Sequence, residues 1–148
     1  MKDVFTVRGV PTIELYDRFG DLKQSLTQDN LIVDTGKNYF LRKIFNQFSG
    51  TEFDLDIIAL GSGTTAPTLS DTSLETQFAT ATVNSYAFET NNEIVVIAGF
   101  IQGSGTGTIN ELGLLASDDT LISRIVVDTP FDKTATDFLN VSWTFQIG

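Results

Sequence analysis

The clearest alternation of apolar and polar residues lies near the end of the chain. From Leu139 to Ile147 every second side chain is apolar, and the side chains between them are polar. Because successive side chains of a strand point to opposite faces, the pattern predicts a strand with one face in the core, Trp143 included. Shorter stretches of similar character are separated by turn residues at intervals of about 8 to 15 positions, which predicts roughly seven to nine mostly antiparallel strands.

Residues 55–78 are expected to organise the rest of the chain. The apolar run 57–60 predicts a buried strand, and Gly61 and Gly63 then break it, since glycine reaches backbone angles closed to other residues. Thr72 and Glu75 have the spacing of a capping box, which predicts one short helical turn after the loop. A second glycine-rich stretch, 103–107, predicts a tight turn before the next strand.

Residues 34–48 form the one good helix candidate. Asp34 or Thr35 can cap it, and its apolar positions follow helical spacing. These positions are Tyr39, Phe40, Ile44, Phe45 and Phe48. Three basic residues lie between them, namely Lys37, Arg42 and Lys43. The helix is therefore amphipathic, and we expect it to cover an open end of the sheets rather than to lie on a membrane.

Together these patterns predict an all-β fold, an antiparallel, jelly-roll-like β-sandwich with one short amphipathic helix and an N-terminal arm. Residues 1–12 are expected to be an arm or edge strand, and 13–148 a single sandwich domain. The arm is less acidic than the rest of the chain, so it is the predicted contact with a neighbouring subunit or another protein. The predicted interface residues are Val4, Phe5, Val7, Arg8 and Val10. The run 94–97 is apolar on both faces, which predicts a central strand or one covered by a partner in a homotrimer.

Composition removes several classes of function. The 148 residues include neither cysteine nor histidine, so disulfides, thiolate metal sites and the usual base near neutral pH are absent. The net charge is −10, and residues 44–148 carry two Lys or Arg against thirteen Asp or Glu. Such a field opposes binding to nucleic acid, and no apolar run approaches the ~20 residues of a membrane span.

Candidate chemical sites have simpler structural interpretations. Neither glycine-rich loop has the ending of a P-loop. Glu52, Asp54 and Asp56 lack the ligand density of a calcium loop. Glu111 opens an apolar strand, and we interpret it as a carboxylate that accepts backbone N–H bonds from a neighbouring loop, with a catalytic acid of raised pKa as the alternative. We therefore expect no enzymatic activity, no cofactor and no metal.

Several ordered motifs resemble a family of small structural proteins of tailed bacteriophages. They are Asn30–Val33 with Gly36–Asn38, Ile58–Pro67, Ser70–Leu74, Gly107–Leu115 with Arg124, and Lys133–Phe145. The similarity runs over most of residues 10–147, and Asn110 stands where a threonine or serine is expected. The resemblance implies a virion component with a β-sandwich or jelly-roll body and no catalytic motif.

The place in the virion that we expect is the outside of the head. There the protein would be a capsid decoration (cement) protein, made in the host cytoplasm and bound to the major capsid protein or other virion structural proteins. Alternatives are a tail collar, fibre or baseplate module and a virion-surface carbohydrate-binding module.

Overall fold

The computed structural model describes residues 6–45, 47 and 54–148. Within these residues the chain forms ten strands and one helix. In chain order they are β1 (Val7–Tyr16), β2 (Leu22–Thr27), β3 (Leu31–Ile32), α1 (Asp34–Ile44), β4 (Leu55–Gly61), β5 (Gln77–Thr82), β6 (Ser85–Thr90), β7 (Glu93–Phe100), β8 (Gly107–Ala116), β9 (Leu121–Lys133) and β10 (Phe138–Ile147).

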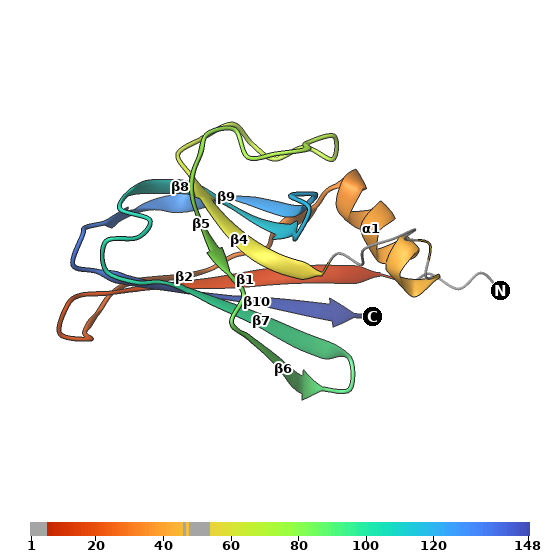
Figure 1. The fold of residues 1–148 in the computed structure, drawn as a ribbon, viewed down its shortest axis with the longest axis horizontal. Coiled ribbons are helices and arrows are strands. Elements are labelled where there is room, and N and C mark those ends of the chain that lie inside the picture. The colour runs from red at the N-terminus through yellow and green to blue at the C-terminus, as the bar shows by residue number, and fades with distance from the viewer. Residues whose placement is uncertain (1–5, 46, 48–53) are drawn as a thin grey trace.

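The strands form two five-stranded antiparallel sheets that pack face to face (Figure 1). Sheet A has the order β2-β1-β10-β7-β6, and sheet B has the order β3-β9-β8-β4-β5. The antiparallel β-sandwich with one short helix is therefore confirmed. Four pairs of consecutive strands, β1–β2, β4–β5, β6–β7 and β8–β9, are neighbours in one sheet. This local pattern is simpler than the two Greek keys of a jelly roll.

The alternation near the C-terminus is confirmed in β10, a central strand of sheet A. Leu139, Val141, Trp143 and Phe145 are buried against sheet B, and the residues between them are half-buried on the other face. Burying each such side chain stabilises the fold by about 1.5–3 kcal/mol. Trp143 is 0% exposed. In the amide orientation that satisfies its neighbours, Asn30 accepts hydrogen bonds from Trp143 Nε1 and Ser123 Oγ, both at 2.9 Å.

The predicted arm is wrong for residues 7–12, because they belong to β1. Residues 12–16 of this strand lie between β2 and β10, whereas residues 7–11 form a ladder with β10 alone, as the predicted edge strand would. It pairs with β10 over its whole length, from Val7 opposite Ile147 to Tyr16 opposite Phe138. The sequence hides this because Gly9 and Pro11 interrupt the apolar alternation, although a strand accepts a proline where its missing N–H lies on an unpaired side. Residues 1–5 lie outside the described part of the chain.

Helix α1 begins at Asp34 and ends at Ile44, four residues before the predicted end, and Phe48 is not among the described residues. Val33 occupies the N-cap position without a side-chain hydrogen bond, so neither predicted cap is used. Thr35 Oγ1 instead donates to the carbonyl of Leu121 at 2.6 Å, which ties the first turn to sheet B. The predicted aromatic stripe is only partly buried: Tyr39 is in the core, whereas Ile44 and Phe45 are exposed.

The outer face of sheet B is covered by the long connection between β4 and β5, residues 62–76, here named the covering loop (Figure 1). Leu74 packs in a small buried cluster with side chains of the outer face and of the α1 entry. These are Val33, Ala59, Leu115 and Leu121. The covering loop contains no helix, so the predicted helical turn at 72–75 is wrong. The tight turn at 103–107 is confirmed, with positive φ at three of its glycines.

The run 94–97 in β7 is apolar on both faces, as its sequence indicates. Val96 is buried and Ile94 packs against the same core. Val95 and Ile97 lie half-buried on the outer face of sheet A, opposite Thr144 and Ser142 of β10. A partner over this outer face stays a prediction.

Candidate functional site

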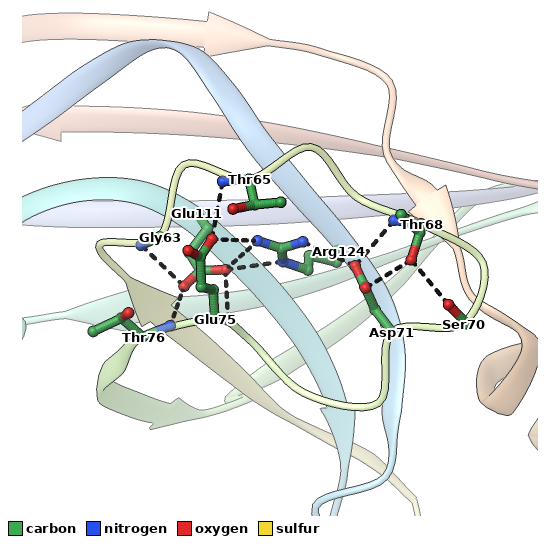
Figure 2. A network of polar contacts seen from close by, with 9 residues as sticks. All are labelled: Gly63, Thr65, Thr68, Ser70, Asp71, Glu75, Thr76, Glu111 and Arg124. Carbon is green, nitrogen blue, oxygen red and sulfur yellow. Dashed lines mark hydrogen bonds and ion pairs between the residues drawn. The ribbon is translucent and has the colours of Figure 1, made fainter.

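The strongest concentration of buried polar groups lies beneath the covering loop, on the outer face of sheet B. Glu111 comes from β8 and Arg124 from β9, and the two side chains meet diagonally because Arg124 pairs with Gly113 and Glu111 with Val126. Glu111 is 0% exposed and Arg124 is 3% exposed. Asp71 and Glu75 descend from the covering loop onto the same guanidinium, as Figure 2 shows. We call these four residues the Arg124 cluster.

Glu111 holds the two ends of the covering loop together. Its Oε1 accepts hydrogen bonds from the backbone N–H of Gly63 at 3.1 Å and of Thr76 at 2.7 Å. Its Oε2 accepts from the backbone N–H of Glu75 at 3.0 Å (Figure 2). Charge-assisted bonds of this kind are about twice as strong as neutral ones. The interpretation of Glu111 as an acceptor of loop N–H bonds is therefore confirmed.

Arg124 links Glu111 to the middle of the covering loop. Its Nε donates to Glu111 Oε2 at 2.9 Å, and its Nη1 donates to Asp71 Oδ2 at 2.8 Å. Nη2 lies 2.8 Å from Glu111 Oε2 as an ion pair without hydrogen-bond geometry, and 3.7 Å from Glu75 Oε2. Burial disfavours the charged form, but the hydrogen bonds and charges of Asp71 and Glu111 outweigh burial and raise the pKa of Arg124 further. The guanidinium is therefore fixed in place and always charged.

The carboxylates of Asp71 and Glu75 also accept hydrogen bonds from other residues of the covering loop. Asp71 accepts from the N–H of Thr68 at 3.0 Å and from its hydroxyl at 2.8 Å. Burial alone would raise the pKa of Asp71, but the bonds from Thr68 and Arg124 lower it below its usual value. Glu75 accepts from the N–H of Thr65 at 2.9 Å, and this bond lowers the pKa of Glu75. Both residues therefore cap loop turns instead of a helix.

Gly63 is required here by space and not by its backbone angle. Its φ is not in the left-handed region, contrary to the conformational reason expected from the sequence. A Cβ added at Gly63 would lie 2.5 Å from Glu75 Cβ and 2.6 Å from Glu111 Oε1, closer than real Cβ contacts. Glycine therefore lets the loop backbone reach the buried carboxylate.

The Arg124 cluster can clamp the covering loop, but it is poorly arranged for acid–base chemistry. The carboxyl groups of Glu111, Asp71 and Glu75 all accept bonds from loop N–H groups. A general acid needs a pKa raised toward the working pH, whereas those of Asp71 and Glu75 are lowered. The three carboxyl groups surround the Arg124 guanidinium, and among the described residues no group of three or more His, Cys, Asp or Glu side chains is placed so that it could hold a metal ion. Asp54 pairs with Lys43 at 3.3 Å, and Glu52 lies outside the described residues.

The five predicted interface residues do not share one surface. Val7 faces the inner side of sheet A and packs at the edge of the core. Arg8 and Val10 point to the opposite side, where Arg8 forms an exposed ion pair with Asp29 at 2.7 Å. Val4 and Phe5 lie outside the described residues. Their contact with a partner stays a prediction.

Sequence reasoning singled out Glu111 but missed its partners, Arg124 and Asp71. The available signal was Arg124 itself, a lone charge in the apolar strand 121–127, because an arginine is almost never fully buried without a partner. A second buried acid, Asp137, was also missed. It accepts a bond from Lys23 Nζ at 2.9 Å, which fixes the connection between β9 and β10 to β2.

Comparisons of the chain with protein-family models, curated proteins and solved structures find no match. In the part of the chain that the structure describes, no helix has the length and apolar character to cross a membrane.

Proposed function

We propose that the protein is a structural component of a bacteriophage virion, a capsid decoration (cement) protein that binds the outer head surface as a homotrimer and stabilises the shell. The observation that carries the proposal concerns the motifs that resemble phage structural proteins. Motifs as far apart as 58–67, 70–74, 107–115 and Arg124 meet in one buried cluster. Part of the resemblance therefore lies in residues that clamp a loop, and a clamped loop suits a durable structural part.

The clamp suits a protein whose task is to resist force. A long surface connection normally opens at low free energy, because few buried contacts hold it. Here the covering loop is fixed by Glu111 at both ends and by Arg124 through Asp71 in the middle. A body whose longest described connection is fixed in this way can transmit tension between shell subunits as packaged DNA presses outward.

Electrostatics favours the outside of the head. The net charge of −10 opposes contact with packaged DNA, since DNA binding is driven by Lys and Arg contacts to phosphate. The partner we propose is the major capsid protein, and the assembled state is a homotrimer because three-fold closure suits capsid junctions. A carbohydrate-binding role through Trp143 has no support, because its ring is buried and its N–H is bonded to Asn30.

The test is to locate the chain on intact particles by electron cryo-microscopy and to heat particles with and without it. We expect density for this sandwich on the outer shell, and DNA release at a lower temperature when the chain is missing. Density at the collar, the fibres or the baseplate would replace the cement assignment by a tail module. Absence of the chain from purified particles would overturn the virion assignment.

A further inference from the structure

Exposed apolar side chains gather at the end of the sandwich where α1 lies. Half of the large exposed apolar residues of the described chain belong to α1 or its C-cap, to β6 or to the last residue of β10. They are Leu41, Ile44, Phe45, Tyr86, Phe88 and Ile147. We name these six residues the apolar end surface; Figure 1 shows α1 and the end of β10 on this side of the molecule. Apolar surface gathered in this way marks interaction sites on soluble proteins.

A groove runs through this surface, between α1 and the β6–β7 hairpin. It encloses about 290 Å³, and its walls include Phe40 and Ile44 of α1, Phe88 of β6 and Ile94 of β7. Phe88 pairs with Ile94 in register, so both face the side of sheet A that elsewhere forms the core. Leu55 of β4 reaches the groove from sheet B, but Phe88 is 81% exposed. The groove is therefore core-type surface that the described residues leave partly open.

The two elements that flank the groove carry opposite charge, and Glu93 is the one charged residue among the described residues that line it. Helix α1 carries Lys37, Arg42 and Lys43 against one acid, in a chain whose net charge is −10. The β6–β7 hairpin carries Glu89 and Glu93 and no basic residue. A second copy can therefore place its acidic hairpin against the basic helix of the first, whereas most other approaches of two such acidic chains are repulsive.

We propose that the apolar end surface is where copies of this chain associate, with Phe88 of one copy entering the groove beside α1 of the next. β6 is the edge strand of sheet A, so its backbone is available on the side away from β7. Such a head-to-tail contact builds a closed ring when its rotation divides a full turn, and a three-fold rotation gives the proposed homotrimer. The inference deepens the proposed function, since it names the surface that builds the homotrimer.

The first test compares two phenylalanines of similar exposure by sedimentation or light scattering at micromolar concentration. The wild-type chain should have the mass of an oligomer, that is, more than the 16.2 kDa of one chain. Phe88→Ser should raise the dissociation constant by about ten- to a hundred-fold, the effect of losing one buried aromatic side chain. Phe19 is 73% exposed in the β1–β2 turn, and Phe19→Ser should leave the mass unchanged. A wild-type monomer, or dissociation by Phe19→Ser alone, overturns the inference.

The second test exchanges charges across the interface. Lys37→Glu and Glu89→Lys should each weaken association by about two- to five-fold, and the double variant should recover it, because the pair is restored with reversed signs. A double variant as dissociated as the single ones overturns the pairing of α1 with β6.

Binding to purified particles separates this inference from the proposed function. If Phe88→Ser is a monomer and still binds heads, the apolar end surface is the contact between copies of the chain. If the wild-type chain assembles but does not bind particles, only the virion role is refuted.

Discussion

Arg124 Nε donates to Glu111 Oε2 at 2.9 Å in a position where water reaches neither side chain. Taking both groups out of water is costly, and their attraction offsets that cost only when the remaining donors and acceptors are also satisfied. The covering loop supplies three backbone N–H groups to Glu111 and a carboxylate to Arg124. The covering loop therefore keeps its conformation because the buried charges bind it, and the charges can stay buried because the loop supplies their partners.

Replacing Arg124 by alanine should lower the free energy of unfolding by about 3–5 kcal/mol, because it leaves Glu111 buried without its cation. Urea unfolding followed by circular dichroism measures the change. Arg8→Ala is the matched control. Its ion pair with Asp29 is as short, at 2.7 Å, but both side chains are more than half exposed, so about 0–1 kcal/mol is expected. Equal losses in the two variants would show that Arg124 is not a buried clamp.

Adding a single methyl group at Gly63 should loosen the covering loop. The new Cβ would meet Glu111 Oε1 and Glu75 Cβ at 2.6 and 2.5 Å, so Gly63→Ala has to displace the loop or the carboxylate. We expect a loss of about 1–3 kcal/mol and faster amide exchange at Thr76. Gly99→Ala serves as control, since its nearest neighbour would lie 3.9 Å away, and its stability should stay close to wild type. If Gly63→Ala is equally neutral, the close approach is not real.

Trp143 provides a test of the buried core and of the carbohydrate alternative. Trp143→Ala should cost about 3–5 kcal/mol, because it empties the space between the sheets. Trp143→Phe should cost less and leave Asn30 without one donor. The fluorescence of the wild-type tryptophan should not change when surface polysaccharides of the host are added. A shift on titration, with folding intact, would revive the carbohydrate-binding alternative.

The sandwich could be predicted because strand alternation is a local property. The strict pattern of 139–147 describes β10 correctly, and Glu111 was recognised since an acid at the opening of an apolar strand needs donors. The error at residues 7–12 has the same origin. Gly9 and Pro11 break the local pattern, and only the pairing with β10 shows that the strand continues.

The Arg124 cluster could not be assembled from the sequence, because its members come from three distant segments. Thr72 and Glu75 have the spacing of a capping box, a local preference that the contacts of Asp71 and Glu75 with Arg124 override. The register of β8 against β9, which brings Glu111 beside Arg124, is set by a bulge between Ile109 and Glu111. Such an irregularity leaves no clear mark in the order of residues.

Lowering the pH should reduce the stability of the fold through the carboxylates that bind Arg124, Lys23 and the loops. The pKa values of Asp71, Glu75 and Asp137 are lowered in the folded chain, so the unfolded chain binds protons more readily than the folded one. Their contribution to stability is therefore complete above the ordinary carboxyl pKa and is lost as the pH falls through the lower folded values. Urea midpoints should stay level from pH 7 to about pH 5 and fall steadily below it.

Asp71→Asn should flatten this acid dependence, because it removes one of the three depressed carboxyls while leaving Glu75 and Asp137 in place. The variant should be less stable than wild type at pH 7, since Arg124 loses a charged partner, and the two should converge as the pH approaches 3. The measurement is a series of urea titrations at each pH for both proteins. Parallel curves that never converge would mean that Asp71 stabilises the loop through its shape and hydrogen bonds alone, and not through its charge.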